Sequence, residues 1–243
     1  MSSTFHGITP GVAFGKPGPF DVGSAAPPNP LLTGLVSWWD LDEESGVRAD
    51  SVGSNDLTDN NTVLYAAGKI GNAADIVQAN NEYFNNATFP TTADYTISTW
   101  VYANAGLANC DLLSAIDTWP NQAWSAVYLS GGTWYQLVGN GSAYVFVANG
   151  AISTETWLHI VTWYDSSTNK ASLSINGSIA TTGALSGTLY DSSGAINLRL
   201  GFGGGVGASW DGLMDLTGVW NRVLTADERT ELYNLGAGKD YPF

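Results

Sequence analysis

One segment, residues 157–164, limits the folds open to this chain more than any other. Successive side chains of a β-strand point to opposite faces of the sheet. The two faces of such a strand would carry Trp157, His159, Val161 and Trp163 on one side and Leu158, Ile160, Thr162 and Tyr164 on the other. Both faces are therefore largely apolar, which is typical of a strand covered from two sides. We predict that this segment is a central strand of a sheet with two buried faces.

Tight-turn signals separate several other short apolar runs. Asn176-Gly177 stands between Ile175 and Ile179, and this dipeptide favours the hairpin turn that needs positive φ at both central residues. Asn140-Gly141 and Asn149-Gly150 enclose residues 144–147 in the same manner. Strands joined by such turns predict an antiparallel all-β fold.

One helix is predicted, close to the C-terminus. Residues 210–224 are typical of a strand, and Thr225 then starts a capping box that Glu228 completes three residues later. Gly236 stands where a left-handed residue would end the helix. The expected apolar stripe consists of Leu232, Tyr233 and Leu235.

The composition agrees with one large β domain. The chain has 243 residues, and all-β sandwiches of this length commonly form a single domain. Only 12% of the residues are charged, against about 25% in typical proteins. The single cysteine, Cys110, excludes an intrachain disulfide, and we expect it to be a small core or loop residue and not a nucleophile.

Blocks of sequence in a fixed order connect the chain to a known fold. They are Gly34 to Gly46, Asp50 to Leu57, Gly68 to Ala73, Tyr95 to Val101, Trp157 to Val161, Leu173 to Gly177, Trp210-Asp211-Gly212 with Asp215, and Asn221 to Thr225 followed by a helix ending in Leu232-Tyr233. Together they resemble the laminin G-like, concanavalin A-like jelly-roll domains over residues 34–236. The resemblance implies an antiparallel jelly-roll β-sandwich with one short C-terminal helix. It specifies the fold and not the function, because this sandwich serves lectins, hydrolases, adhesins and scaffold proteins.

The first 33 residues differ in character from the rest. Prolines spread among Gly, Ser and Ala prevent a regular strand or helix there, namely Pro10, Pro17, Pro19, Pro27, Pro28 and Pro30. We therefore divide the chain into an extended N-terminal docking arm, residues 1–33, and the jelly-roll domain, residues 34–243. The arm has no features of a secretory signal. We expect it to dock on a partner, the alternative being that it folds back along its own sandwich.

The negative net charge of the chain argues against nucleic acids and anionic membranes as partners. The formal net charge is −14, and the eight Lys and Arg residues are scattered, whereas a nucleic-acid-binding protein needs them clustered. Anionic membranes are disfavoured for the same reason, and no apolar run is long enough to span a bilayer. Solubility and cation binding both remain explanations of the acidity.

The resemblance implies a structural calcium site. Asp50 and Asn55 lie in an Asp-Ser-Val-Gly-Ser-Asn loop, and Asp215 follows the Asp-Gly turn. In the domains that this chain resembles, such groups can hold a Ca²⁺ ion at the sandwich edge, and carboxylate and amide oxygens are suitable ligands. The alternative is that Asp50 caps a turn and Asp215 accepts hydrogen bonds from neighbouring amides.

Aromatic residues in the middle of the chain suggest glycan binding. The candidates are Trp119, Trp124, Trp134, Tyr135 and Tyr144, whose rings could stack on the C–H faces of sugars while Asn121, Gln122 or Asn140 bonds hydroxyl groups. For the three tryptophans, packing between the sheets is the competing interpretation.

We predict that the protein is not an enzyme. Jelly-roll glucanases carry a Glu-x-Asp-x-(x)-Glu strand, and the nearest run here, residues 40–44, begins with Asp and leads into a Ser45-Gly46 turn. The Pro/Gly arm and the end at Leu232 to Phe243 resemble laminin G-like proteins of tailed phages. We therefore expect a multi-copy structural and display protein of a virion, such as a capsid decoration, head-fibre or tail component, made in the host cytoplasm. The alternatives are an extracellular carbohydrate-binding module or adhesin of a bacterium, and third a glycoside hydrolase.

Overall fold

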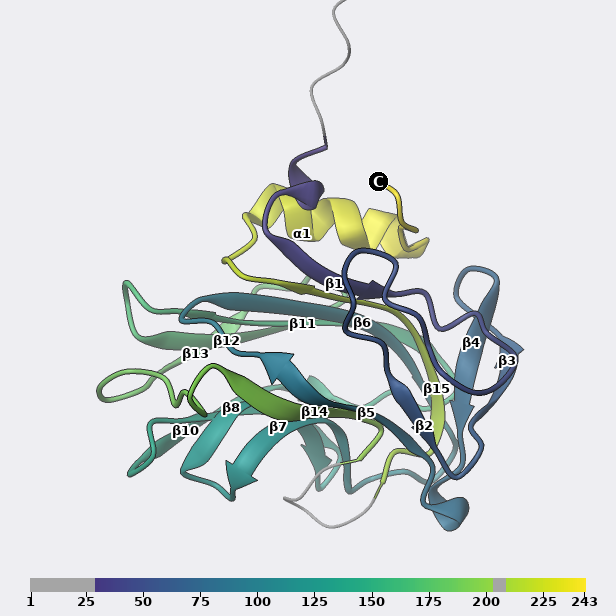
Figure 1. The fold of residues 1–243 in the computed structure, drawn as a ribbon, viewed down its shortest axis with the longest axis horizontal. Coiled ribbons are helices and arrows are strands. Elements are labelled where there is room, and N and C mark those ends of the chain that lie inside the picture. Colours follow the sequence, from purple (N-terminus) through teal and green to yellow (C-terminus); the bar gives the residue numbers. More distant parts are fainter. Residues whose placement is uncertain (1–28, 203–208) are drawn as a thin grey trace, which may run out of the picture.

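Two antiparallel sheets pack face to face in the computed structural model, which describes residues 29–202 and 209–243 (Figure 1). The eight-stranded sheet has the order β13 (Thr181–Ala184), β12 (Lys170–Ile175), β11 (Trp157–Asp165), β6 (Tyr95–Ala103), β15 (Gly212–Trp220), β4 (Asn72–Ile76) and β3 (Leu64–Ala67), with β1 (Leu35–Trp39) also paired to β15. The seven-stranded sheet has the order β10 (Tyr144–Ala151), β9 (Thr133–Gly139), β8 (Gln122–Ser130), β7 (Cys110–Thr118), β14 (Ala195–Leu200), β5 (Tyr83–Pro90) and β2 (Thr58–Asn60). This architecture confirms the predicted all-β jelly-roll sandwich.

The strand at residues 157–164 is central, as predicted. β11 pairs with β6 on one side and with β12 on the other. Leu158, Ile160 and Tyr164 are buried in the core between the sheets. His159 and Trp163, on the opposite face, are buried as well. A sheet with two covered faces follows, because a second layer lies on its outer side.

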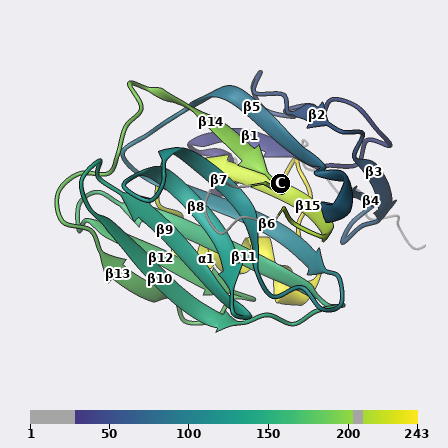
Figure 2. The same cartoon turned by 90° about the horizontal axis from the view of Figure 1, so that it is seen from below.

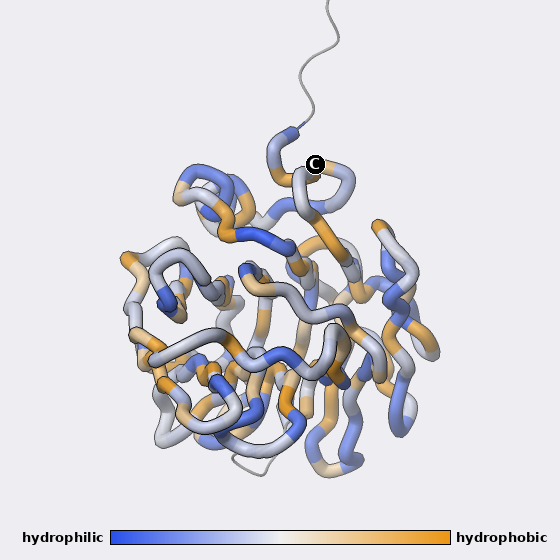
Figure 3. The backbone as a smooth tube through the Cα atoms, turned by 60° about the vertical axis from the view of Figure 1, so that its left-hand side comes forward, coloured by the Kyte–Doolittle hydropathy of each residue, from blue (hydrophilic) through white to orange (hydrophobic). Residues whose placement is uncertain are grey.

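The main core fills the space between the sheets. It is rich in large side chains, including Trp39, Trp124, Trp134, Trp210, Phe84, Phe89 and Tyr95. Hydrophobic and hydrophilic residues alternate along the chain (Figure 3). Because successive side chains of a strand point to opposite faces, such alternation allows each strand to direct its apolar side chains inward. Cys110 is buried and free, as expected, and burial raises the pKa of its thiol to about 12.

A second core lies between the outer face of the eight-stranded sheet and the helix α1 (Ala226–Tyr233). Its buried members are Leu31, Trp38, Trp100, Leu216, Trp220, Leu224 and Leu232. Trp38 and Trp220 meet edge to face at 6.2 Å between ring centroids, and Tyr233 stacks on Trp100 at 5.9 Å. The C-terminal Tyr241 and Phe243 pack against the same cluster. The sandwich thus has a third layer over the eight-stranded sheet.

Residues 29–33, the end of the predicted arm, pack on the second core through Leu31. Leu31 is fully buried in the 3₁₀ turn η1 (Pro30–Leu32), and its carbonyl accepts a hydrogen bond of 2.7 Å from the Trp220 indole. Arg222 donates to the carbonyls of Pro30 and Thr33. The remainder of the predicted arm, residues 1–28, lies outside the described residues.

The helix starts as predicted and ends earlier. Thr225 and Glu228 form the capping box. Asn234 and Leu235 already take positive φ, with values of 47° and 53°, before Gly236. Leu235 is 93% exposed, so it does not belong to the apolar stripe that the sequence suggested. The short helix therefore rests on Leu232 and Tyr233, while two further 3₁₀ turns, η2 (Gln78–Asn80) and η3 (Asn234–Gly236), complete the described elements.

The two ends of the described chain lie on the same side of the molecule. Asn29 donates a hydrogen bond of 2.8 Å to Glu231 of α1, and Figure 1 shows the C-terminus beside α1, above the eight-stranded sheet. Figure 2 shows the opposite side, where the seven-stranded sheet faces the viewer and α1 lies behind it. Among the described residues, no helix has the length and apolar character needed to cross a bilayer.

Candidate functional site

The outer face of the seven-stranded sheet carries a group of aromatic side chains. Trp134 and Val138 of β9 and Val147 of β10 point into the main core. Because neighbours along a strand face opposite ways, Tyr135, Tyr144 and Phe146 point outward. Tyr128 of β8 and Trp119, from the β7–β8 turn, pack on the same side. We call these five residues, Trp119, Tyr128, Tyr135, Tyr144 and Phe146, the aromatic surface.

The five rings form one contiguous patch. Tyr128 and Tyr135 stand opposite each other in register, and their rings stack at 5.3 Å with an interplanar angle of 12°. Phe146 connects the patch, with its centroid 4.9 Å from Tyr144, 6.0 Å from Tyr128, 6.3 Å from Trp119 and 6.5 Å from Tyr135. Tyr144 is 46% exposed and Phe146 is 41% exposed. Beneath the rings lie the buried side chains of Ile116, Ala126 and Leu137.

The structure brings together three of the five predicted glycan-binding residues and separates two. Trp119, Tyr135 and Tyr144 belong to the aromatic surface. Trp124 is only 1% exposed, with its indole bonded to the Thr92 carbonyl at 2.9 Å. Trp134 is fully buried, 5.8 Å from Trp210. Both tryptophans are packed in the main core between the sheets, the place that the competing interpretation gives them, and they present no exposed ring face.

Sequence reasoning missed Tyr128 and Phe146. Phe146 could have been found, because it follows Tyr144 by two residues in the same strand and must share its face. The amide of Asn140 is unsuited to the role suggested for it. Its Oδ1 accepts from the backbone N–H groups of Ser142 and Ala143, and its Nδ2 donates to the Ser186 carbonyl. It holds the β9–β10 turn instead.

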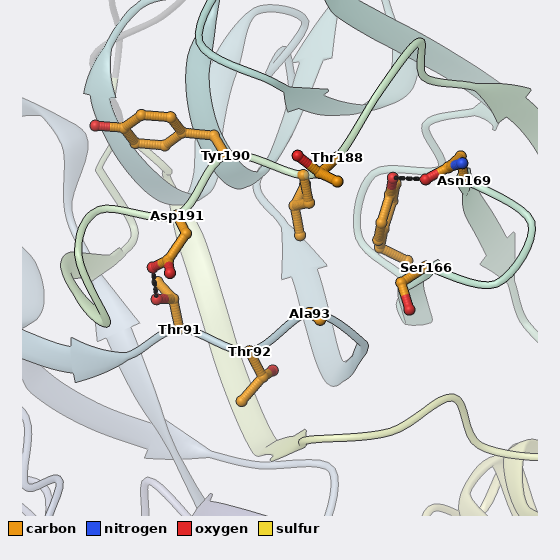
Figure 4. A pocket seen from close by; sticks show the side chains of 10 residues that line it. Thr91, Thr92, Ala93, Ser166, Asn169, Thr188, Tyr190 and Asp191 are labelled. Carbon is orange, nitrogen blue, oxygen red and sulfur yellow. Dashed lines mark hydrogen bonds between the residues drawn. The ribbon is translucent and has the colours of Figure 1, made fainter.

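A small cavity lies at one end of the sandwich, where three connections meet (Figure 4). It has a volume of about 180 Å³. Its lining residues come from the β5–β6 turn, the β11–β12 hairpin and the β13–β14 connection, and are Thr91, Thr92, Ala93, Tyr164, Ser166, Asn169, Thr188, Leu189, Tyr190 and Asp191. No such grouping was predicted, because the three connections are far apart in sequence.

Hydrogen bonds fix the polar groups around this cavity. Asp191 accepts from the Thr91 hydroxyl at 2.6 Å and from the Gly194 N–H at 2.8 Å, and these bonds lower the pKa of its carboxyl. Tyr190 points away from the cavity (Figure 4) and donates to Asp117 at 2.7 Å, a bond that raises the pKa of its hydroxyl. Asp191 is therefore an ionised acceptor at neutral pH.

The residues predicted to hold calcium are divided between two hydrogen-bond groups. The Asp50 carboxylate accepts from the backbone N–H groups of Trp38, Val52 and Asn55 at 3.0–3.1 Å. Asn55 donates to Ser37 at 2.8 Å. Asp215 instead accepts from the N–H groups of Lys69 and Ile70. This is the arrangement of the hydrogen-bonding alternative, and the calcium site stays a prediction.

Acidic side chains at this edge mainly support loops. Burial raises the pKa of Asp215 to about 8 and that of Asp40 to about 6. Asp40 accepts from the Ser51 hydroxyl at 2.9 Å, and Asp42 accepts from the Asn72 N–H at 2.7 Å. Within residues 29–202 and 209–243, no group of three His, Cys, Asp or Glu side chains is placed to hold a metal ion.

Comparisons with known proteins identify the fold. A family model described as the concanavalin A-like lectin/glucanases superfamily matches residues 75–228. The search of curated proteins found no match. Among solved structures, domain 4 of an extracellular arabinanase from Geobacillus stearothermophilus, in complex with arabinotriose, has a TM-score of 0.58 and 21% identity over 81% of this chain and 97% of that one.

Two further structures show the same fold at lower identity. The binding domain of the paraclostridial mosquitocidal protein 1 has a TM-score of 0.66 and 16% identity, over 83% of this chain and 52% of that one. Trypanosoma rangeli sialidase has a TM-score of 0.59 and 15% identity, over 85% of this chain and 34% of that one. The chain thus spans about half of the toxin's binding domain and about a third of the sialidase.

Proposed function

Because the chain belongs to the concanavalin A-like lectin/glucanases superfamily, we propose that it is a non-enzymatic display protein that binds glycans through the aromatic surface. The N-terminal segment attaches it to a larger assembly. The assembly that the sequence favours is a phage virion, with the protein as a capsid decoration, head-fibre or tail component.

The observation that carries the proposal is the contiguous aromatic surface, in which Tyr128 is buried and Tyr144 and Phe146 are exposed. Two of its rings, Tyr144 and Phe146, are more than 40% exposed on one sheet face. Aromatic faces stack on the apolar C–H faces of sugar rings, and the tyrosine hydroxyls can bond sugar hydroxyls at the same time. The arabinanase domain of the same fold was solved with arabinotriose, which supports a sugar as the ligand class.

The surroundings of the aromatic surface support binding without turnover. Glycoside hydrolysis generally uses two carboxyl groups that flank the scissile bond. Asp117, at the β7 end next to Trp119, accepts hydrogen bonds from the hydroxyls of Tyr190 and Ser192, so its carboxylate holds the neighbouring loop. The acidic run at residues 40–44 bonds its own loop and the β3–β4 turn.

The position of the chain ends supports display. Asn29 bonds Glu231 of α1, and the C-terminus lies on the same side (Figure 1). The aromatic side chains are on the outer face of the seven-stranded sheet, which is turned away from α1 (Figure 2). A protein held at its N-terminal end would therefore present its aromatic rings away from its support. Many copies on one particle would compensate for weak binding at each surface through avidity. A bacterial carbohydrate-binding module is the second candidate, favoured by the likeness to the arabinanase domain.

The test is a glycan array followed by titration calorimetry with the best oligosaccharide. Tyr144→Ala and Phe146→Ala should each weaken binding by about tenfold or more, because each removes a stacking ring. Tyr65→Ala is the matched control, since Tyr65 is 43% exposed on the edge strand β3 of the other sheet. An array without any signal would refute the proposal, as would a variant with both Tyr144→Ala and Phe146→Ala that binds as tightly as the parent. If the protein hydrolyses a bound glycan and Asp40→Asn abolishes this hydrolysis, the non-enzymatic part of the proposal is refuted.

A further inference from the structure

We infer that the cavity between the β5–β6 turn, the β11–β12 hairpin and the β13–β14 connection is a second binding site, which takes a single neutral sugar residue. The site extends glycan binding beyond the aromatic surface and does not depend on it. Its lining residues, given above, are separate from the five rings of that surface.

The cavity offers hydrogen-bonding groups that no other part of the described protein uses. Asp191 employs its Oδ1 twice, toward Thr91 and Gly194, and its Oδ2 has no partner among the described residues. The Tyr164 hydroxyl donates to Asn169 Oδ1 at 3.1 Å, which leaves the Nδ2 group of that amide as a free donor. The side-chain hydroxyls of Ser166 and Thr188 likewise have no hydrogen-bond partner within the described ranges.

These groups stand around the cavity on different sides. In Figure 4, Asp191 and Thr91 lie on one side and Asn169 and Ser166 on the other, with Thr188 at a third position. Apolar contact comes from Ala93 and Leu189. Polar side chains around a small, partly apolar space suit a ring with hydroxyl groups on its rim.

The volume of the cavity and the charge of its lining residues limit the class of ligand that it can bind. About 180 Å³ is well below the roughly 300–1,000 Å³ of sites for drug-sized ligands, so one ring fits better than a chain. No Lys or Arg is among the described residues that line the cavity, and Asp191 is ionised because its hydrogen bonds lower its pKa. A uronic or sialic acid would meet this negative charge, so a neutral sugar is favoured. A cation would find only one carboxylate among those residues.

The site is held in shape before any ligand arrives. Thr91 N–H donates to the Gly194 carbonyl at 3.1 Å, which ties the first connection to the third. Ser166 N–H donates to Asp94 at 2.7 Å, which ties the second to the first. Tyr190 N–H donates to the Gly139 carbonyl at 2.7 Å and anchors the third connection on β9. Such preorganisation reduces the entropy lost on binding.

The experiment uses ¹⁵N NMR of the full chain with D-glucose, D-galactose, D-mannose and L-arabinose as separate probes. At least one sugar should shift the amides of Thr91, Ser166, Thr188 and Gly194. Asp191→Asn should weaken that binding by about tenfold or more, because it removes a charged hydrogen-bond acceptor. Thr188→Trp, at an exposed position, should fill the cavity and abolish the binding. D-glucuronic acid should bind more weakly than D-glucose.

Two controls separate this site from the aromatic surface and from general charge effects. Asp227→Asn removes the same charge at the exposed start of α1 and should leave the affinity unchanged. Phe146→Ala should also leave it unchanged, whereas it should reduce oligosaccharide binding at the aromatic surface. The inference fails if no probe shifts the cavity amides, if Asp191→Asn and Thr188→Trp bind as the parent does, or if D-glucuronic acid binds as tightly as D-glucose.

Discussion

At the scale of single residues, Asp215 shows how burial changes an acidic group. It is fully buried at the β-bulge of β15, next to Leu216 with φ of 47°. Two backbone N–H groups contact its Oδ2, and Oδ1 has no hydrogen-bond partner in the described part of the chain. Removal from water disfavours the charged form and raises its pKa to about 8. The side chain is therefore mostly protonated at neutral pH in the absence of a bound cation.

Asp215 should make the protein less stable as the pH rises. Its pKa is about 8 in the folded chain and about 3.9 in an unfolded one, so the folded state binds more protons between these values. Its contribution is complete below about pH 4 and is lost through about pH 8. The unfolding free energy of the parent relative to Asp215→Asn should fall by about 1.4 kcal/mol per pH unit in this window. Urea unfolding at several pH values, with chelator present, measures this.

A Ca²⁺ ion bound at Asp215 would reverse this expectation, because it would favour the charged carboxylate. An ion bound by Asp50, Asn55 and Asp215 would keep the Asp215 carboxylate charged and would stabilise only the folded state. Chelation would then lower the melting temperature of the parent and leave that of Asp215→Ala unchanged. A melting curve insensitive to chelator, together with the pH slope above, identifies the hydrogen-bonding arrangement.

At the scale of elements, the start of α1 is held by a small charged cluster. Glu228 accepts from the backbone N–H of Thr225 at 2.7 Å and from Arg222 Nη1 at 2.8 Å. The bond to Arg222 is the main reason why the pKa of Glu228 is lowered to about 2. Because Arg222 also bonds Pro30 and Thr33, one side chain joins the helix cap to residues 29–33.

The lowered pKa of Glu228 predicts that the stabilisation by this helix cap is lost at acidic pH. Glu228→Gln should lower the unfolding free energy by about 2 kcal/mol at pH 7, since it removes charged hydrogen bonds to a largely buried group. A depressed pKa contributes stability above the unfolded value, and this contribution is lost as the pH falls from about 4.5 toward 2. The difference between parent and variant should therefore shrink over this range. Thr225→Ala should cost about 1 kcal/mol, with a difference much less sensitive to pH.

Elements with strong local signals could be predicted from the sequence. β11 follows from its two apolar faces, and the Asn176-Gly177 turn has positive φ at both residues, as expected. Asn149-Gly150 is different, because Gly150 sits in a bulge inside β10 and makes no turn. Its local sequence is the same as that of a hairpin, and only pairing with β9 decides between the two.

The candidate sites were less predictable, for physical reasons. Trp134 and Tyr135 are neighbours in one strand, so they could not both face a ligand, and alternation alone does not say which one turns inward. Register shifts between β7 and β8 further obscure the faces near Trp124. The cavity depends on Thr91, Asn169 and Asp191 meeting across three connections, and no local pattern encodes such a contact.

At the scale of the whole molecule, the two outer faces of the sandwich differ in what covers them. The outer face of the eight-stranded sheet is covered by α1, by residues 29–33 and by the C-terminal residues Tyr241 and Phe243. The other outer face leaves the aromatic surface partly exposed. Under the proposed function, attachment and glycan binding would therefore use opposite sides of the sandwich.

Truncation should separate attachment from folding. Deletion of residues 1–28 should leave the melting temperature unchanged but prevent incorporation into the assembly, because residues 29–33 and their bonds to Trp220 and Arg222 are retained. Leu31→Ala should instead lower the unfolding free energy by about 2–5 kcal/mol, since it empties a buried site in the second core. Normal incorporation of the truncated protein, measured by mass spectrometry of purified particles, would contradict an attachment role.

The common side of the two chain ends also determines how the molecule can be immobilised. A biotin or a fused partner at the C-terminus would leave from the α1 side (Figure 1), and Asn29, the first described residue, also lies there, bonded to Glu231 of α1. Either coupling would orient every molecule with its Tyr144 and Phe146 rings toward the solution. On a patterned support, the distance between neighbouring ring patches would then be set by the spacing of the anchors, which makes the multivalent contribution to glycan capture adjustable without changing a single residue of the sandwich.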